Sequence, residues 1–137
     1  HEARTRELLE RGYLWNISGL GEYFIGLLQR KDFQKKYEQI RKRAVADRDG
    51  FFSRLSKIKG IKVYQSKGNF FLIELIDGAK SDDLVVSLLT RYGIYIRSCK
   101  DKTGLRGEFV RIASRTKIEN RLFIKALNSI LYPVVKL

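Results

Sequence analysis

The sequence predicts an α+β fold in which a small, mostly antiparallel sheet of about four strands carries helices on one side and follows a long helix. Apolar residues recur at three- and four-residue steps in the first part of the chain, which is typical of amphipathic helices. Short alternating runs follow, and the expected elements come in the order helix, strand, strand, helix, strand, strand, helix. With 137 residues, of which 44% are apolar, the chain can form the core of one globular domain.

The first part of the chain is expected to be helical. Residues 2–11 predict a short charged helix that ends at Gly12, and residues 18–30 predict a second helix. Asp32 is expected to be the N-cap of the longest helix, with an interruption at Gly50. The apolar residues of this helix are spaced to form one buried stripe: Phe33, Tyr37, Ile40, Ala44, Phe51, Leu55 and Ile58.

Two strands and a helix are expected after Gly60, which ends the long helix. Residues 61–64 and 69–75 predict the strands, and the second of them is expected to be central because it is the more apolar. Ser81 is expected to cap a helix that ends at Gly93.

Two arginines on the next two expected strands are the candidates for a functional site. Arg97 ends the run 94–97, and Arg111 lies at the centre of the run 109–113, opposite its apolar neighbours. A guanidinium group suits carboxylate or phosphate, because two parallel donors meet two oxygens and the charge persists at physiological pH. We therefore expect both groups on one open face as an anion clamp. The alternative is a pair of solvated strand arginines.

A last helix is expected over residues 117–131. Thr116 and Glu119 have the spacing of a capping box, which predicts that strand gives way to helix at Thr116. Tyr132-Pro133 is expected to end this helix.

The run from Gly93 to Asn120 resembles the C-terminal end of class I/II aminotransferases, the fold-type I pyridoxal-phosphate enzymes. Within them it is most similar to the histidinol-phosphate aminotransferase and threonine-phosphate decarboxylase group. Trp15-Asn16-Ile17-Ser18 is similar to the segment that leads from the large domain to the small one. Residues 65–73, Gln-Ser-Lys-Gly-Asn-Phe-Phe-Leu-Ile, resemble the Pro-Ser-x-x-Asn-Phe start of a strand, with Gln65 in place of proline. Arg115 stands where the aminotransferases usually have glycine, which favours a decarboxylase-like or a less characterised branch.

The resemblance implies roles for both arginines. The arginine that matches Arg111 binds the α-carboxylate of the substrate, and the one that matches Arg97 helps to hold a distal anion, often a phosphate. A bidentate grip on the carboxylate fixes the torsion about the α-carbon relative to the cofactor ring. The resemblance implies a pyridoxal-phosphate-dependent aminotransferase that acts on an amino acid, with a phosphorylated one among the candidates. A decarboxylase is the alternative, and the sequence does not separate the two activities.

Pyridoxal phosphate is expected in the full-length parent and not in this chain alone. The sequence has no Ser-x-x-Lys followed by a glycine-rich stretch and no G-x-G-x-x-G. It also contains no methionine, so we expect this chain to be the C-terminal part of a larger enzyme and to be inactive alone. Residues 1–16 are expected to connect from a missing large domain, and residues 17–137 to form the small domain. No catalytic, cofactor-binding or metal-binding residue is expected in this chain, and the parent is expected to be a homodimer.

The composition and charge of the chain suggest functions other than that of an aminotransferase-family domain. The net charge of +13 and the run Arg41-Lys42-Arg43 favour a basic nucleic-acid-binding module, with Asn69-Phe70-Phe71 as a stacking strand. Against it, acidic residues mix with these cations along a helix face, as on a solvated surface. A purely structural or dimerising domain is a further alternative. The single cysteine, Cys99, favours a cytoplasmic protein, and His1 is the only histidine, which argues against a metal site. No apolar run approaches the length of a membrane helix.

Overall fold

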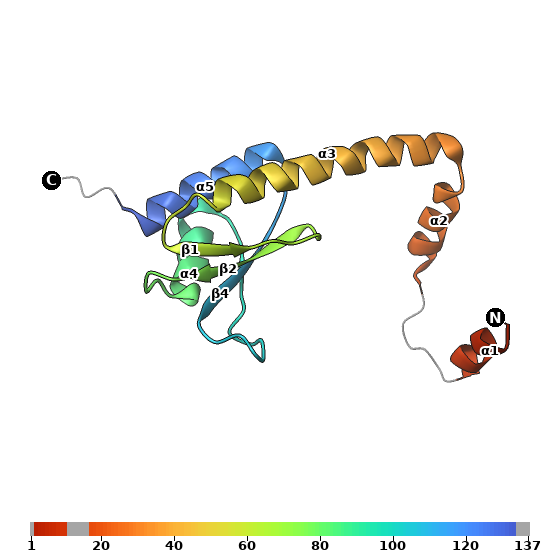
Figure 1. Cartoon of the computed structure of the whole chain (residues 1–137), viewed down its shortest axis with the longest axis horizontal. Helices are drawn as coiled ribbons and strands as arrows, with labels where there is room; N and C mark the ends of the chain where they lie inside the picture. The colour runs from red at the N-terminus through yellow and green to blue at the C-terminus, as the bar shows by residue number, and fades with distance from the viewer. Residues whose placement is uncertain (1, 11–16, 134–137) are drawn as a thin grey trace. The chain divides into compact units, whose positions relative to one another are not determined.

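The computed structural model describes residues 2–10 and 17–133 of the chain (Figure 1). The chain divides into two compact units, residues 1–42 and residues 43–137. Gly12, where the first helix was expected to end, and Trp15-Asn16 lie outside the described residues.

The second unit contains a four-stranded antiparallel sheet with the strand order β1-β2-β4-β3, so β2 is central as expected. The predicted α+β class is confirmed. In chain order the elements are α1 (Glu2–Glu10), α2 (Gly19–Leu28), α3 (Lys31–Leu55), β1 (Ile61–Tyr64), β2 (Phe70–Leu75), α4 (Ser81–Tyr92), β3 (Arg97–Ser98), β4 (Glu108–Ala113) and α5 (Lys117–Leu131).

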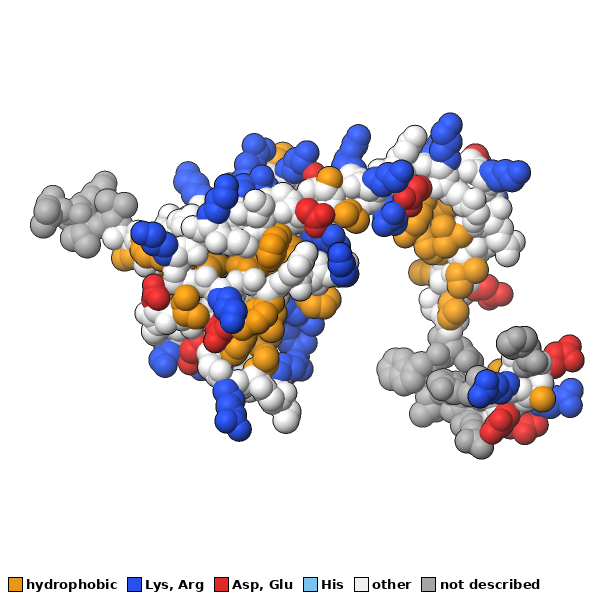
Figure 2. Space-filling view, in the orientation of Figure 1, with side chains coloured by type: hydrophobic (Ala, Val, Ile, Leu, Met, Phe, Trp, Pro, Cys, Tyr) orange, Lys and Arg blue, Asp and Glu red, His pale blue; other side chains and the backbone are white. Residues whose placement is uncertain are grey.

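The first unit consists of helices. The Ser18 hydroxyl accepts a hydrogen bond from the Gly21 amide at 3.3 Å and so begins α2. Phe24 of α2 contacts two rings at the start of α3, those of Phe33 and Tyr37, with centroid distances of 5.9 Å to each. Other apolar residues of α2 remain exposed: Leu20, Tyr23 and Ile25. Figure 2 shows apolar side chains gathered on this part of the chain.

The long helix α3 differs from the sequence expectation at its start, in its burial, at Gly50 and at its end, which is Leu55 and not Gly60. It begins at Lys31, so Asp32 is not its N-cap; the Asp32 carboxylate lies in the first turn and pairs with Arg30 at 3.1 Å. The apolar stripe is not buried throughout. Phe51 and Leu55 are buried within the second unit, whereas Ile40, in the first unit, is 68% exposed. Spacing alone predicts which face of a helix is apolar, but not how far along the helix a partner covers it. The helix continues without interruption through Gly50.

The core of the second unit lies between one face of the sheet and the helices. In β2, alternate residues Phe71, Ile73 and Leu75 are buried, which places the other alternate residues on the opposite face. The Phe51 ring meets those of Phe71 and Phe123 edge-on, at 6.0 Å in each case. The buried core residues are Phe51, Leu55, Ile58, Ile61, Phe71, Ile73, Leu75, Leu84, Leu88, Ile96, Val110, Ile112, Phe123, Ala126 and Leu127. The expected packing of helices on one side of the sheet is confirmed.

The start of α4 is organised by a residue of β4 rather than by its own N-cap side chain. Ser81 was expected to be the N-cap, but it is the first helical residue and Lys80 is the cap. The Glu108 carboxylate accepts hydrogen bonds from the Ser81 amide at 2.8 Å and the Ser81 hydroxyl at 2.6 Å. These two bonds, followed by the charges of Lys100 and Lys80, lower the pKa of Glu108 from 4.5 to about 2. These hydrogen bonds hold the start of α4 against β4 of the sheet.

Glu108→Gln is expected to lower the thermal stability of the chain in a pH-dependent way. Because the folded pKa lies below the ordinary value, ionised Glu108 stabilises the fold above pH 4.5, and this contribution is lost as pH falls toward 2. The Tm difference between wild type and variant, measured by circular dichroism, should therefore be largest near neutrality and shrink below pH 4.5.

Asp83→Asn is the matched control for this experiment. Asp83 lies in the same first turn of α4, and among the described residues it has no hydrogen-bond or ion-pair partner. A Tm difference for Glu108→Gln that stays constant from neutral pH to acid, or one equalled by Asp83→Asn, would contradict the role assigned to Glu108.

Candidate functional site

The face of the sheet opposite the helices carries the two arginines. We call it the open face, and it comprises Lys62 and Tyr64 of β1, Phe70, Leu72 and Glu74 of β2, Arg97 of β3, and Phe109, Arg111 and Ala113 of β4. Arg111 is directly opposite Leu72 on one side and directly opposite Arg97 on the other. Directly opposite residues point to the same face of a sheet. The expected placement of both arginines on adjacent strands and on one face is therefore confirmed, and their binding roles remain predictions.

Arg111 is exposed, and its charge faces an aromatic ring. The guanidinium carbon lies 5.3 Å from the centre of the Phe70 ring. Within residues 2–10 and 17–133, no carboxylate lies within ion-pair distance of Arg111. Two arginines that are directly opposite repel each other, and this repulsion is relieved when an anion binds between them. The geometry thus leaves Arg111 available to a carboxylate ligand.

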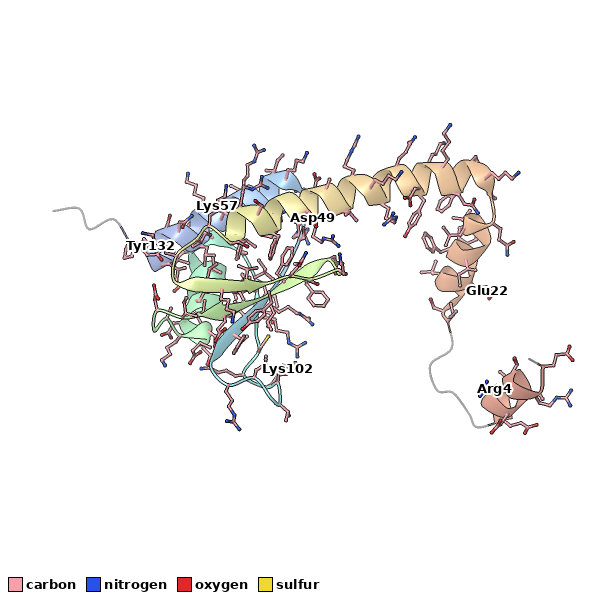
Figure 3. All side chains as sticks on the ribbon, in the orientation of Figure 1. Arg4, Glu22, Asp49, Lys57, Lys102 and Tyr132 are labelled. Atoms are coloured by element: carbon pink, nitrogen blue, oxygen red, sulfur yellow. The ribbon has the colours of Figure 1, made fainter. Side chains whose placement is uncertain are left out.

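Arg97 has an internal partner on the loop between β3 and β4. Its Nη2 lies 3.0 Å from Oδ2 of Asp101, and Lys102 Nζ lies 2.9 Å from the same oxygen. Lys102, and after it Arg97, lowers the pKa of Asp101. Figure 3 shows Lys102 on this loop. Both side chains of this ion pair are exposed, and exposed ion pairs contribute little to stability. Asp101 is therefore a partner that a stronger anion can displace.

Part of the open face is closed by its own side chains. Phe109 shares the face with Arg111, as expected from alternation, but it is buried. The Tyr64 ring lies 6.3 Å from the Phe109 ring, and the Tyr64 hydroxyl donates to Glu74 at 2.7 Å. The accessible region is therefore the part near Arg97, Arg111 and Phe70.

The end of β4 is fixed by a buried amide. Asn120 of α5 accepts from the Arg115 amide at 2.9 Å and donates to the Arg115 carbonyl at 3.0 Å. The Arg115 side chain donates to Glu119 at 2.7 Å. The expected capping box is present, since Thr116 Oγ1 accepts from the Glu119 amide while the Glu119 side chain bonds back to Thr116. These contacts hold the turn that follows Arg111 and its strand.

The open face does not fit pyridoxal phosphate itself. It contains a lysine, Lys62, whose Nζ lies 4.9 Å from the centre of the Tyr64 ring. The Tyr64 side chain beside it, followed by the Glu74 carboxylate, raises the pKa of Lys62. A Schiff-base lysine must lose its proton, which a raised pKa opposes. The two arginines of this face suit an anionic group instead.

Among the described residues, no group of three or more histidine, cysteine or acidic side chains is arranged to hold a metal ion. None of the helices described is both long and apolar enough to cross a membrane.

Three residues of this site have no predicted role in it. Phe70 is predicted only as part of a strand motif and of a stacking strand for nucleic acid, and no local pattern predicts a role for Leu72 or Asp101. Alternation in the run 69–75 places Phe70 and Leu72 on one face. That Leu72 lies opposite Arg111 depends on the register of β2 and β4, for which the sequence carries no direct signal.

Comparison with known proteins identifies relatives over most of the chain. A family model described as aminotransferase class I and II matches residues 6–127. An L-serine phosphate decarboxylase of Campylobacter jejuni is 51% identical over 126 residues, which cover 92% of this chain and 32% of that protein. A histidinol-phosphate aminotransferase of Methanococcus aeolicus is 35% identical over 106 residues, covering 77% of this chain and 28% of that protein. The chain spans about a third of the length of these relatives.

Solved structures give the same result. A decarboxylase from Sulfurospirillum multivorans matches with a TM-score of 0.86 and 42% identity, covering 96% of this chain and 37% of that one. The L-threonine-O-3-phosphate decarboxylase of Porphyromonas gingivalis matches with a TM-score of 0.62 and 31% identity, covering 66% of this chain and 27% of that one. The chain therefore belongs to the aminotransferase class I and II family, whose members depend on pyridoxal phosphate.

Proposed function

We propose that this chain is the substrate-recognition domain of a pyridoxal-phosphate-dependent decarboxylase that acts on a phosphorylated amino acid. Residues 17–137 are the C-terminal small domain, and residues 1–16 connect it to a large domain that holds the cofactor. The observation that carries the proposal is the direct pairing of Arg97 and Arg111 on the open face. A small amino acid with an anion at each end offers one group to each guanidinium.

In this proposal Arg111 binds the α-carboxylate and Arg97 binds the phosphate. The role of Arg111 is supported by the lack of a carboxylate partner for it among the described residues. Arg97 has a partner, Asp101, but this ion pair is exposed and a substrate phosphate can displace the carboxylate. The cofactor supplies the bond-breaking chemistry when it is bound to the rest of the protein. The residues of this chain bind and orient the substrate, which restricts it to a reactive geometry.

The relatives favour decarboxylation over amino transfer. L-serine phosphate decarboxylases of Campylobacter jejuni and Sulfurospirillum multivorans are 51% and 44% identical, against 35% for the histidinol-phosphate aminotransferase of Methanococcus aeolicus. Amino transfer remains the second candidate, because it also requires an oriented carboxylate and the family is named for it.

The described charges do not favour the nucleic-acid alternative. Figure 2 shows lysine and arginine side chains along α3, but several cations of this helix and of α5 are paired. Arg41 pairs with Glu38 at 2.6 Å, and Lys117 pairs with Asp47 at 3.2 Å. Ion pairs at these positions are typical of a solvent-exposed helix surface.

The direct test of the proposal is an assay of the longer, cofactor-loaded protein with L-phosphoserine, with L-serine as the matched substrate that lacks the phosphate. Release of carbon dioxide from L-phosphoserine, with little from L-serine, is expected. Transfer of the amino group to a 2-oxo acid without release of carbon dioxide would establish the aminotransferase instead. Equal activity on both substrates would show that the enzyme does not recognise the phosphate, and this part of the proposal would be wrong.

Arg97→Ala is expected to reduce kcat/KM for L-phosphoserine much more than for L-serine. Loss of a charge-assisted contact at an exposed site typically costs about 1.5 to 3 kcal/mol, or roughly 10- to 150-fold in rate constant. The loss should fall on the phosphorylated substrate because the phosphate is the group that Arg97 binds. Asp101→Asn is the companion variant, which removes the internal competitor and should not lower activity on L-phosphoserine. Equal losses on both substrates in Arg97→Ala would show that Arg97 supports the fold or the carboxylate.

A further inference from the structure

Phe70 is the neighbour of Arg111 on the open face. The register places Phe70 directly opposite Ala113 and Arg111 directly opposite Leu72, so Phe70 and Arg111 are diagonal neighbours across the β2–β4 pair. Ala113 has a small side chain, which leaves space for the Phe70 ring beside Arg111. The guanidinium carbon lies 5.3 Å from the ring centre, within the range of a cation–π contact.

The Phe70 ring is supported from behind by a tight turn. A Cβ atom on Gly68 would lie 3.3 Å from Cε1 of Phe70, so the backbone of Gly68 lies close to the ring. The Gly68 amide donates to the Ser66 hydroxyl at 3.0 Å. Between this turn and Phe70, the Asn69 carbonyl accepts from the Ser114 amide at 2.7 Å. The backbone that leads into Phe70 is thus held by hydrogen bonds.

The same turn is anchored to α3. Nη1 of Arg48 donates to the Lys67 carbonyl at 2.7 Å, and the Arg48 side chain is only 12% exposed. Asp49 pairs with Arg48 at 2.7 Å and so compensates its charge. Arg48, the turn at residues 66–68 and the Phe70 ring therefore form a continuous set of contacts that ends at Arg111.

We infer that Phe70 is a positioning residue for Arg111, an inference that rests on the proposed function of Arg111 as the carboxylate-binding residue. A free arginine side chain has many rotamers, and ordering it on binding has an entropic cost. Contact of the ring with the guanidinium group restricts those rotamers before the substrate arrives. A cation–π contact uses no N–H donor of the arginine, so the donors remain available for the carboxylate.

The kinetic test compares Phe70→Leu and Phe70→Tyr in the longer, cofactor-loaded protein. Leucine is apolar but has no ring, whereas tyrosine keeps the ring. A cation–π contact of this kind corresponds to roughly 3- to 30-fold in kcat/KM, and we expect a loss of this size in Phe70→Leu. Phe70→Tyr should keep activity within about twofold of wild type, since tyrosine also offers a ring face. Loss of activity in both variants, or in neither, would overturn the inference.

The same substitution in an Arg111→Ala background separates positioning from folding. If Phe70 acts through Arg111, Phe70→Leu should cause no further loss once Arg111 is absent. A further loss of the same size in that background would show that the ring supports the fold, and the inference would fail. Arg111→Ala with wild-type kinetics would remove the proposed function together with the inference. If Arg111→Ala lowered kcat/KM and Phe70→Leu did not, only the inference would fail.

A readout that does not depend on activity is the rate at which phenylglyoxal modifies Arg111, followed by peptide mass spectrometry. Removing the ring should raise this rate in Phe70→Leu and leave it unchanged in Phe70→Tyr. Tyr92→Leu is the matched control, because Arg91 lies 5.6 Å from the Tyr92 ring in a similar contact on α4. That control should raise the rate at Arg91 and not at Arg111. An unchanged Arg111 rate in Phe70→Leu would count against the inference.

Discussion

Arg111→Ala is expected to lower kcat/KM of the longer, cofactor-loaded protein for its amino-acid substrate by roughly 30-fold to several thousand-fold. This range corresponds to about 2 to 5 kcal/mol, the usual cost of removing one partner of a buried hydrogen-bonded charge pair, since we expect the substrate and the large domain to cover Arg111 in the longer protein. Arg111 has no carboxylate partner among the described residues, so its contact with the substrate is not replaced by an internal one. Steady-state kinetics with the phosphorylated amino acid measure the effect.

Two companion measurements make this result specific. Arg111→Lys keeps the positive charge but loses the bidentate fork, so it should recover only part of the activity. Affinity for pyridoxal phosphate, measured from cofactor absorbance, should change little because the open face does not fit the cofactor. Arg91→Ala, on α4, is the control for loss of an arginine elsewhere on the surface. Unchanged kinetics in Arg111→Ala would remove the main functional proposal.

Phe51→Ala is expected to destabilise the second unit by about 3 to 5 kcal/mol, the usual cost of replacing a core phenylalanine by alanine. Phe51 is fully buried, and its ring contacts both Phe71 of the sheet and Phe123 of α5. The substitution leaves a cavity where α3, the sheet and α5 meet. Because a domain of this size is stable by only about 5 to 15 kcal/mol, the loss is a large part of the total. Urea denaturation followed by circular dichroism measures it.

Ile40→Ala is the matched control on the same helix. Ile40 belongs to the same apolar spacing as Phe51 in the sequence, but it is 68% exposed. Its replacement should change the free energy of unfolding by no more than about 0.5 kcal/mol. If both substitutions destabilised the chain equally, the assignment of the core to the second part of α3 would be wrong.

Local patterns predicted most elements because they depend on neighbouring residues. The capping box at Thr116 and Glu119 was predicted from spacing and is present, as is the end of α5 before Pro133. The two N-cap predictions, at Asp32 and Ser81, were wrong because another residue engages each side chain. Arg30 donates a hydrogen bond to the Asp32 carboxylate, and the Ser81 hydroxyl donates one to Glu108. Glu108 lies far away in the sequence, so a local pattern contains no information on that contact.

The strand β3 shows the same limit. Alternation predicted a strand over residues 94–97, but β3 consists only of Arg97 and Ser98. A strand requires a partner, and the register of β3 with β4 holds two residue pairs, Arg97 with Arg111 and Ser98 with Val110. The sequence identified both arginines because long cations on strand faces are unusual. It did not identify the contact with Phe70, which depends on register, or the competing Asp101, which depends on the course of a loop.

The exposed apolar residues of α2 have a consequence for handling the chain in solution. Leu20, Tyr23 and Ile25 attract other apolar surfaces, while the net charge of +13 makes copies of the chain repel one another. At 0.1 M, salt largely screens the repulsion between charges that are more than about 10 Å apart. Salt does not weaken the attraction between apolar surfaces. The colloidal stability of the chain is thus a balance that dilute buffer favours and concentrated salt opposes, the reverse of the usual practice of adding salt to keep a basic protein in solution.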